Sequence, residues 1–162
     1  MVRLVSADLR LLDAALAGDD ELARALGTRV VPGWATFAYA LTHVRNAVAA
    51  NPSITDWGSR FFVAGDPPEL VGWGGFKGPP DDDGTIEVGY EVAESRQGRG
   101  LATEAVAAML DHAFAQAGVT AAIAHTLPEH NASTRVLEKS GFAHDGEASE
   151  NGQKVWRWRR DR

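Results

Sequence analysis

The pattern of apolar and polar residues predicts mainly helices in the first third of the chain and mainly strands after it. Some segments repeat apolar residues at helical spacing, and others alternate as strands do. The expected elements are, in chain order, a strand over 2–5, helices over 7–17, 20–26 and 35–50, strands over 61–64, 70–76 and 85–92, a helix over 102–117, and strands over 121–126 and 154–162. Ser6 and Asp19 stand where helix N-caps are expected. Turns rich in Gly and Pro separate the middle strands, which are therefore expected to form an antiparallel meander.

A glycine turn joins the predicted strand 85–92 to the helix that follows it. The first N–H groups of a helix lack intrahelical acceptors and lie at the positive end of its dipole, so they can bind a phosphate. Gly98 and Gly100 let the backbone approach a diphosphate, and Arg99 can add a charge-assisted contact. The turn lacks the Lys-Ser/Thr ending of a P-loop and the third glycine of a dinucleotide fingerprint. It predicts an anion site, although a tight connection without a ligand would have the same pattern.

Two motifs give the sequence a family resemblance. Gln97-x-x-Gly100-x-Ala102 resembles the acetyl-coenzyme A pyrophosphate loop of the GNAT superfamily of N-acetyltransferases. Further on, Asn131 follows a strand, a short helix comes next, and Gly141-Phe142 begins another strand, as in this family. The closest subgroup is the Rim-type, or ribosomal-protein, acetyltransferases and their small-molecule relatives. The resemblance implies one α/β domain over 1–162, with a mixed, mostly antiparallel sheet flanked by helices on both faces.

The resemblance also implies that acetyl-coenzyme A is the acetyl donor. The thioester brings an activated acetyl group, so the protein has to align it and help to move protons. In this family the strand before the glycine turn splays from its neighbour, and its free amides serve the pantetheine arm and the thioester carbonyl as an oxyanion hole would. The implied cofactor-binding residues are Tyr90, Glu91, Val92, Gln97, Gly98, Arg99, Gly100, Leu101, Ala102, Thr103, Asn131 and Thr134.

Three residues are candidates for the chemistry itself. Glu87 and Glu91 share one face of a strand and are candidate general bases, directly or through water, unless that face is merely solvent-exposed. Thr134 stands where Rim-type relatives often place a serine, and its hydroxyl could either hydrogen-bond the departing sulfur or cap the short helix. Many family members carry a tyrosine that protonates the thiolate, but the corresponding segment here reads Val136-Leu137-Glu138. The tyrosine is therefore missing.

Composition narrows the remaining possibilities. The absence of cysteine excludes disulfides, thiolate metal sites and a cysteine acyl-enzyme, which leaves direct transfer as the simpler mechanism. The five histidines have no metal-ligand spacing, so no metal is expected. A net charge of −6 argues against nucleic-acid binding and mildly for a cationic substrate. Trp156 and Trp158 alternate with Arg157 and Arg159, which is typical of a strand with one buried face, although stacking on RNA would need the same residues.

These observations predict transfer of acetyl from acetyl-coenzyme A to a primary amine, on a small molecule or a protein N-terminus. The alternative is a non-catalytic acyl-coenzyme A-binding sensor or regulatory module, which the missing tyrosine permits. No long apolar run and no signal-peptide core are present, so a cytoplasmic protein without a membrane partner is expected. Family members are often dimers, so a homodimer is possible. The resemblance places the acceptor groove near the first helices. Four residues there are expected either to line the groove or to pack in the core: Trp34, Phe37, Tyr39 and His43.

Overall fold

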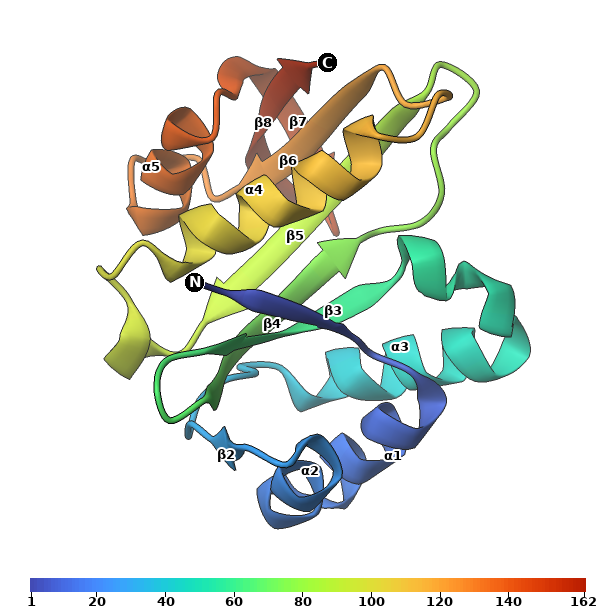
Figure 1. Cartoon of the computed structure of the whole chain (residues 1–162). Coiled ribbons are helices and arrows are strands. Elements are labelled where there is room, and N and C mark those ends of the chain that lie inside the picture. The colour runs from blue at the N-terminus through green and yellow to red at the C-terminus, as the bar shows by residue number, and fades with distance from the viewer.

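An eight-stranded mixed sheet with the order β1-β3-β4-β5-β6-β8-β7 forms the centre of the molecule, and β2 pairs with β4 beside it (Figure 1). The computed structural model describes all residues, 1–162. The strands are β1 (Arg3–Ser6), β2 (Arg29–Val30), β3 (Ser59–Ala64), β4 (Glu69–Phe76), β5 (Thr85–Val92), β6 (Ala121–Thr126), β7 (Ala143–Glu150) and β8 (Gln153–Asp161). The helices are α1 (Leu9–Ala17), α2 (Asp19–Leu26), α3 (Ala38–Ala50), α4 (Leu101–Phe114) and α5 (Ala132–Lys139), with 3₁₀ turns η1 (Pro52–Trp57) and η2 (Glu94–Arg96).

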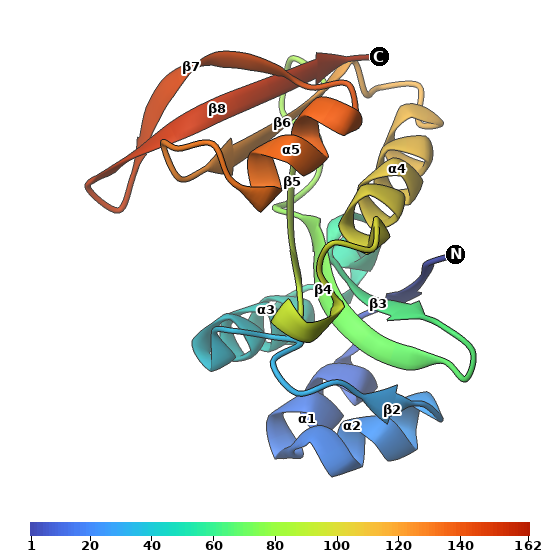
Figure 2. The same cartoon turned by 90° about the vertical axis from the view of Figure 1, so that its left-hand side faces the viewer.

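Two cores lie on opposite faces of the sheet. One forms where α4 and α5 pack on the sheet, and Val106, Met109 and Leu137 are fully buried in it. The other lies under α1, α2 and α3, against β3 and β4, with Leu12 and Leu22 at its centre. Figure 2 shows α1 to α3 gathered at the β3–β4 half of the molecule, while no helix covers the corresponding face of β6, β8 and β7. We call this bare surface the uncovered face.

β5 is the strand on which the two halves of the sheet meet. It pairs antiparallel with β4 along Val88–Val92, but its parallel pairing with β6 is confined to residues 85–87 against 121–123. Beyond Glu87 and Ile123 the two strands diverge. This divergence, which we call the fork, leaves the last part of β5 without a partner on the β6 side.

The predicted elements are confirmed apart from their ends, but both predicted helix caps are wrong. Ser6 is still paired with Arg60 in the sheet, so α1 can begin only later, and the Asp8 carboxylate accepts the capping bond from the Leu11 N–H at 2.9 Å. Asp19 is the first residue of α2 rather than its cap, and its side chain accepts a hydrogen bond from the Trp34 indole at 3.0 Å. Tertiary contacts therefore decide where these helices begin.

The C-terminal strand has the predicted two faces. Trp158 is buried against α5 and α4, whereas Arg157 and Arg159 alternate with it and pair with Asp145 and Asp161. The aromatic and basic residues are therefore separated by the sheet, as packing requires.

None of the helices combines the length and apolar character needed to cross a bilayer.

Candidate active site

A cavity of about 430 Å³ lies at the fork, between the end of β5 and the first turns of α4 and α5. This volume falls within the range typical of sites for small molecules and cofactors. The lining residues come from β5, η2, the glycine turn and both helices, together with one residue from the loop before α3: Thr36, Tyr90, Glu91, Val92, Arg96, Gln97, Gly98, Gly100, Leu101, Ala102, Thr103, Ala132, Ser133, Arg135, Val136 and Lys139.

The backbone of β5 contributes polar groups to this cavity. The Lys77 N–H bonds the Glu87 carbonyl at 2.9 Å and the Ala93 N–H bonds the Val71 carbonyl at 2.8 Å, so odd-numbered residues of β5 direct their backbone groups toward β4. Backbone direction alternates along a strand, so the groups of Tyr90 and Val92 point into the fork. Pairing with β6 has already ended there, so the N–H groups of Tyr90 and Val92 have no partner strand.

The first turn of α4 contributes a second set of N–H groups. Gly100 precedes the helix in the left-handed conformation, with φ 79°, and its carbonyl accepts the first helical bond from the Glu104 N–H at 3.0 Å. No side chain caps the helix, so the N–H groups of Leu101, Ala102 and Thr103 have no partner within it. All three residues line the cavity. The uncapped N–H groups at which an anion site is predicted are therefore part of the cavity wall.

The positive charges around the cavity differ from those predicted. Arg99 is exposed and does not line it, whereas Arg96, Arg135 and Lys139 do. Arg135 and Lys139 are four residues apart on α5 and so share one face of that helix, a spacing that is visible in the sequence. Arg96 immediately precedes Gln97, and no local pattern distinguishes it from Arg99.

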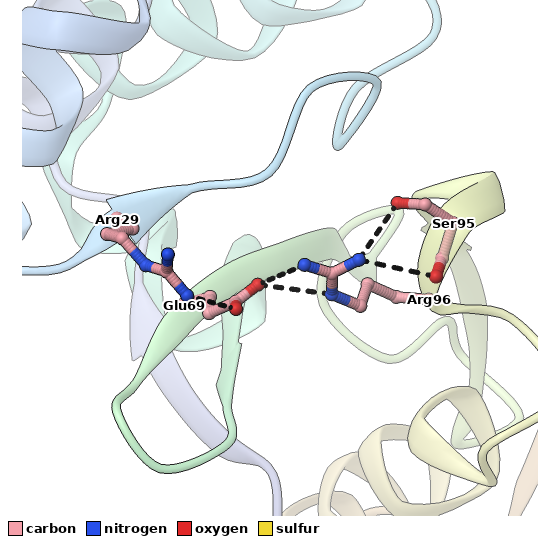
Figure 3. A network of polar contacts seen from close by, with 4 residues as sticks. All are labelled: Arg29, Glu69, Ser95 and Arg96. Atoms are coloured by element: carbon pink, nitrogen blue, oxygen red, sulfur yellow. Dashed lines mark hydrogen bonds and ion pairs between the residues drawn. The ribbon is translucent and has the colours of Figure 1, made fainter.

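A network of ion pairs holds the loop before the glycine turn (Figure 3). Arg96 donates through Nε and Nη2 to Glu69 Oε2 at 3.1 and 2.8 Å, and Arg29 donates to Glu69 Oε1 at 2.6 Å. The hydrogen bond from Arg96 is the main reason why the pKa of Glu69 lies below its ordinary value. Arg96 also donates through Nη1 to the backbone carbonyl oxygen and the hydroxyl oxygen of Ser95. The network ties η2 to the beginning of β4 and β2, which fixes the wall of the cavity that precedes the glycines.

Tyr90 and the first turn of α5 form another part of the cavity wall. The Tyr90 hydroxyl donates to the Ser133 carbonyl at 3.0 Å, and burial raises the pKa of this phenol, so it remains a neutral donor. Asn131 and Thr134 form a reciprocal capping box at the first turn of α5. The Thr134 hydroxyl accepts from the Asn131 N–H at 2.9 Å and donates to the Asn131 carbonyl at 3.0 Å. Neither residue lines the cavity, whereas Ala132 and Ser133 do.

The single hydroxyl proton of Thr134 is thus used within the cap, and the side chain is 1% exposed. We expect Thr134→Val to lower the free energy of unfolding by about 1–2 kcal/mol, because the hydroxyl half of the capping box is lost and the Asn131 N–H is left unpaired, while the bond from the backbone N–H of residue 134 to Asn131 Oδ1 remains. Turnover per folded molecule should remain normal. Thermal melting and steady-state kinetics on one preparation would test this, with Ser133→Ala as the matched loss of a hydroxyl at a residue that lines the cavity. Reduced turnover at unchanged stability would instead place the Thr134 hydroxyl at the departing sulfur.

Glu91 lines the cavity and also joins three segments. Its Oε1 accepts from the Trp73 indole at 2.6 Å and from the Thr36 N–H at 2.9 Å. The carboxylate therefore holds the loop before α3 against β4 and β5. Of the aromatic residues in this loop, Trp34 is buried against Trp73 and Phe61, in accordance with the core alternative.

Three of the candidate acceptor-groove residues lie on the surface. Phe37 and Tyr39 are 53% and 73% exposed and pack on each other, with ring centroids 5.6 Å apart. His43 is also exposed on α3. Neither Trp34 nor any of these three lines the cavity.

Glu87 lies outside the cavity lining, on the same face of β5 as Glu91. Its Oε1 is 2.8 Å from Lys77 Nζ and 2.8 Å from His125 Nδ1. Burial alone would raise the pKa of Glu87, but the hydrogen bonds from Lys77 and His125 outweigh it and the pKa is lowered. Glu150 lies 3.4 Å from His125 and 3.5 Å from Lys77. We call these four residues the Glu87 group. Sequence reasoning missed these partners because they come from segments far apart in the chain.

Comparison with known proteins places this geometry in context. The family model of the acetyltransferase (GNAT) domain matches residues 1–143. YjdG, an uncharacterized N-acetyltransferase of Bacillus subtilis, is 31% identical over 143 residues, which cover 87% of this chain and 85% of that protein. YjcK, a probable N-acetyltransferase of the same organism, is 37% identical over 67 residues, or 41% of this chain and 37% of that protein.

Solved structures share the fold at lower identity. Aminoglycoside acetyltransferase AAC(6')-Ib in complex with coenzyme A and kanamycin gives a TM-score of 0.69 at 17% identity, covering 100% of this chain and 95% of that one. RimL, a ribosomal-protein α-N-acetyltransferase in complex with coenzyme A, gives a TM-score of 0.67 at 18% identity, covering 99% of this chain and 93% of that one. The predicted mixed sheet flanked by helices is thereby confirmed. The closeness to the Rim-type subgroup stays a prediction.

Proposed function

The chain belongs to the GNAT family and is an acetyl-coenzyme A-dependent N-acetyltransferase, and we propose that it transfers acetyl directly to a primary amine that arrives from the uncovered face. One observation carries this proposal. Two sets of backbone N–H groups, from the first turn of α4 and from the free edge of β5, meet in the same cavity of about 430 Å³. Such an arrangement suits a ligand that is charged at one end and extended at the other.

The cofactor would use the two sets differently. Its diphosphate would accept hydrogen bonds from the N–H groups of Leu101, Ala102 and Thr103, with Arg135 and Lys139 adding positive charge. Its pantetheine arm would lie along the free edge of β5 as an additional strand does. The thioester carbonyl would then be polarised by the N–H group of Tyr90 or Val92, which is fixed before the reaction begins.

The acceptor would meet the thioester at the fork. An amine is nucleophilic only without its extra proton, and at neutral pH a lysine side chain costs roughly 3.5 kcal/mol more to deprotonate than an α-amine. We propose that the proton leaves toward the Glu87 group, which lies at the fork on the uncovered face. Glu91 is the weaker candidate because one of its oxygens already accepts two hydrogen bonds that hold the neighbouring loop.

We propose a cationic primary amine as the class of acceptor. The aminoglycoside and ribosomal-protein acetyltransferases that share this fold act on amines of very different size. The net charge of −6 favours a cationic acceptor through long-range attraction. A primary amine on a small molecule or at a protein N-terminus is cationic at neutral pH and is the kind of group that both of these enzymes acetylate.

The test is release of coenzyme A thiol from acetyl-coenzyme A across a panel of amines, with the acetylated product identified by mass spectrometry. The panel should include amino acids, polyamines, aminoglycosides and peptides with free N-termini. We expect thiol release that depends on one amine class and matches the amount of acetylated product. Tight binding of acetyl-coenzyme A without turnover on any amine would instead support a sensor or regulatory module.

A further inference from the structure

His125 lies at the point where β5 and β6 separate. Glu87 is the last residue of β5 that pairs with β6, and its partner Ile123 is two positions before His125. Side chains two positions apart on a strand share a face, so His125 stands beside Glu87 on the uncovered face. The histidine side chain is only 13% exposed, and its Nδ1 is 2.8 Å from Glu87 Oε1. The sequence offered no reason to connect the two residues.

We propose that His125, oriented by Glu87, accepts the proton of the attacking amine. This inference rests on the proposed amine acetylation and specifies the residue that serves it. A carboxylate on Nδ1 favours the tautomer with its proton on that nitrogen, which leaves the lone pair of Nε2 free. Glu87 is then a positioning residue rather than the base.

The contacts of Glu87 favour His125 as the base and Glu87 as the residue that positions it. Its Oε1 already receives Lys77 and His125, and a carboxylate stabilised by two donors is a poorer proton acceptor than a free one. Nε2 of His125, by contrast, takes part in no hydrogen bond within the protein. Imidazole is also the side chain that exchanges protons most readily near neutral pH.

The remaining charged groups around His125 fit the same role. Glu150 of β7 lies 3.4 Å from Nδ1, on the same side of the ring as Glu87. Arg157, the neighbour of His125 in β8, is paired with Asp145 at 3.0 Å. Glu87, His125 and Glu150 could together ligate a cation, but the Lys77 ammonium lies 2.8 Å from Glu87 and 3.5 Å from Glu150. That ammonium competes with any metal ion, so the geometry points to a base.

The proposed step balances without another reactant. The amine nitrogen attacks the thioester carbonyl carbon and forms the C–N bond, while its proton passes to Nε2 of His125. The C–S bond then breaks and coenzyme A leaves as a thiolate. The imidazolium returns the proton to that thiolate, directly or through water, and the ring is neutral for the next cycle.

The decisive experiment combines His125→Ala with chemical rescue. We expect this variant to lose about a hundredfold or more in turnover, the range for loss of a general base, with its affinity for acetyl-coenzyme A nearly unchanged. Added imidazole should restore formation of the acetylated amine in a saturable manner, because the small base can enter the vacated space. With a weakly basic amine as acceptor, the acid limb of the pH–turnover profile should also flatten.

Three further variants make the outcome unambiguous. His125→Gln keeps the approximate size and guards against a folding defect, which melting would reveal. Glu87→Gln should lose turnover without any rescue by imidazole, and Asp145→Asn, which removes a carboxylate from the same face, should behave as the wild type. Normal turnover in both His125 variants, or a loss that imidazole does not restore, would overturn the role of His125. A wild-type protein that acetylates no amine would instead refute the proposed function.

Discussion

Replacing Gly100 with aspartate is expected to weaken acetyl-coenzyme A binding by roughly a hundredfold, which corresponds to about 2.7 kcal/mol. A side chain at this position meets no protein atom within 4 Å, so crowding within the protein is not the cause. The new side chain would instead occupy open space at a residue that lines the cavity. It would also place a negative charge where the diphosphate is proposed to bind.

Gly152→Asp is the matched control for this variant. Gly152 has φ 78°, almost the 79° of Gly100, and a side chain there also meets no atom within 4 Å. It lies in the turn between β7 and β8, outside the cavity lining. Both variants should therefore incur the same backbone strain, and only Gly100→Asp should lose affinity in calorimetry. Wild-type affinity in folded Gly100→Asp would refute the assignment of the diphosphate to the first turn of α4.

The sequence predicted best those parts of the site that one continuous segment builds. The glycine turn needs only a strand, two glycines and a helix in succession, and Gly98, Gly100 and the first turn of α4 line the cavity as expected. The difference between Arg99, which is exposed, and Arg96, which lines the cavity, comes from a partner far away in the sequence. Three residues earlier, Arg96 is held by Glu69 from another strand, and that bond directs the side chain along the cavity wall. A sequence pattern contains no information about such a partner.

Groups assembled from distant segments could not be predicted. The Glu87 group takes Lys77 from the end of β4, His125 from β6 and Glu150 from β7. Alternation along β5 correctly put Glu87 and Glu91 on one face, but it could not tell that Glu91 would bond Trp73 and the backbone before α3. Their different surroundings follow from the fork, which begins between them.

The role of the Thr134 hydroxyl could not be predicted either, although its partner Asn131 is close in sequence. Both readings of its hydroxyl, a cap and a sulfur contact, were compatible with its place three residues after Asn131. The structure has the reciprocal hydrogen bonds of a cap, because the φ of Asn131 is extended and brings its side chain over the Thr134 N–H at 3.0 Å. Local geometry rather than residue type therefore distinguishes the two.

The close approach of β4 to β5 should make Gly74→Ala strongly destabilising, by about 3 kcal/mol, near the upper end of the usual cost of overpacking. A Cβ atom at this position would lie 2.3 Å from the Gly89 carbonyl oxygen and 2.7 Å from the Tyr90 Cα. The Phe62 ring would lie 2.9 Å away on the other side. Because backbone atoms cannot yield as a flexible side chain does, β5 itself would have to move.

Movement of β5 would also disturb the fork, since Tyr90 supplies one of the N–H groups that face it. We therefore expect Gly74→Ala to lower both the denaturant midpoint and the affinity for acetyl-coenzyme A. Gly89→Ala on the adjacent strand is the control, because its Cβ would meet only the flexible Lys77 side chain, at 3.7 Å. That variant should stay within about 1 kcal/mol of the wild type, because the alanine also restricts the unfolded chain. Equal midpoints for the two variants would contradict the tight β4–β5 packing on which the geometry of the fork depends.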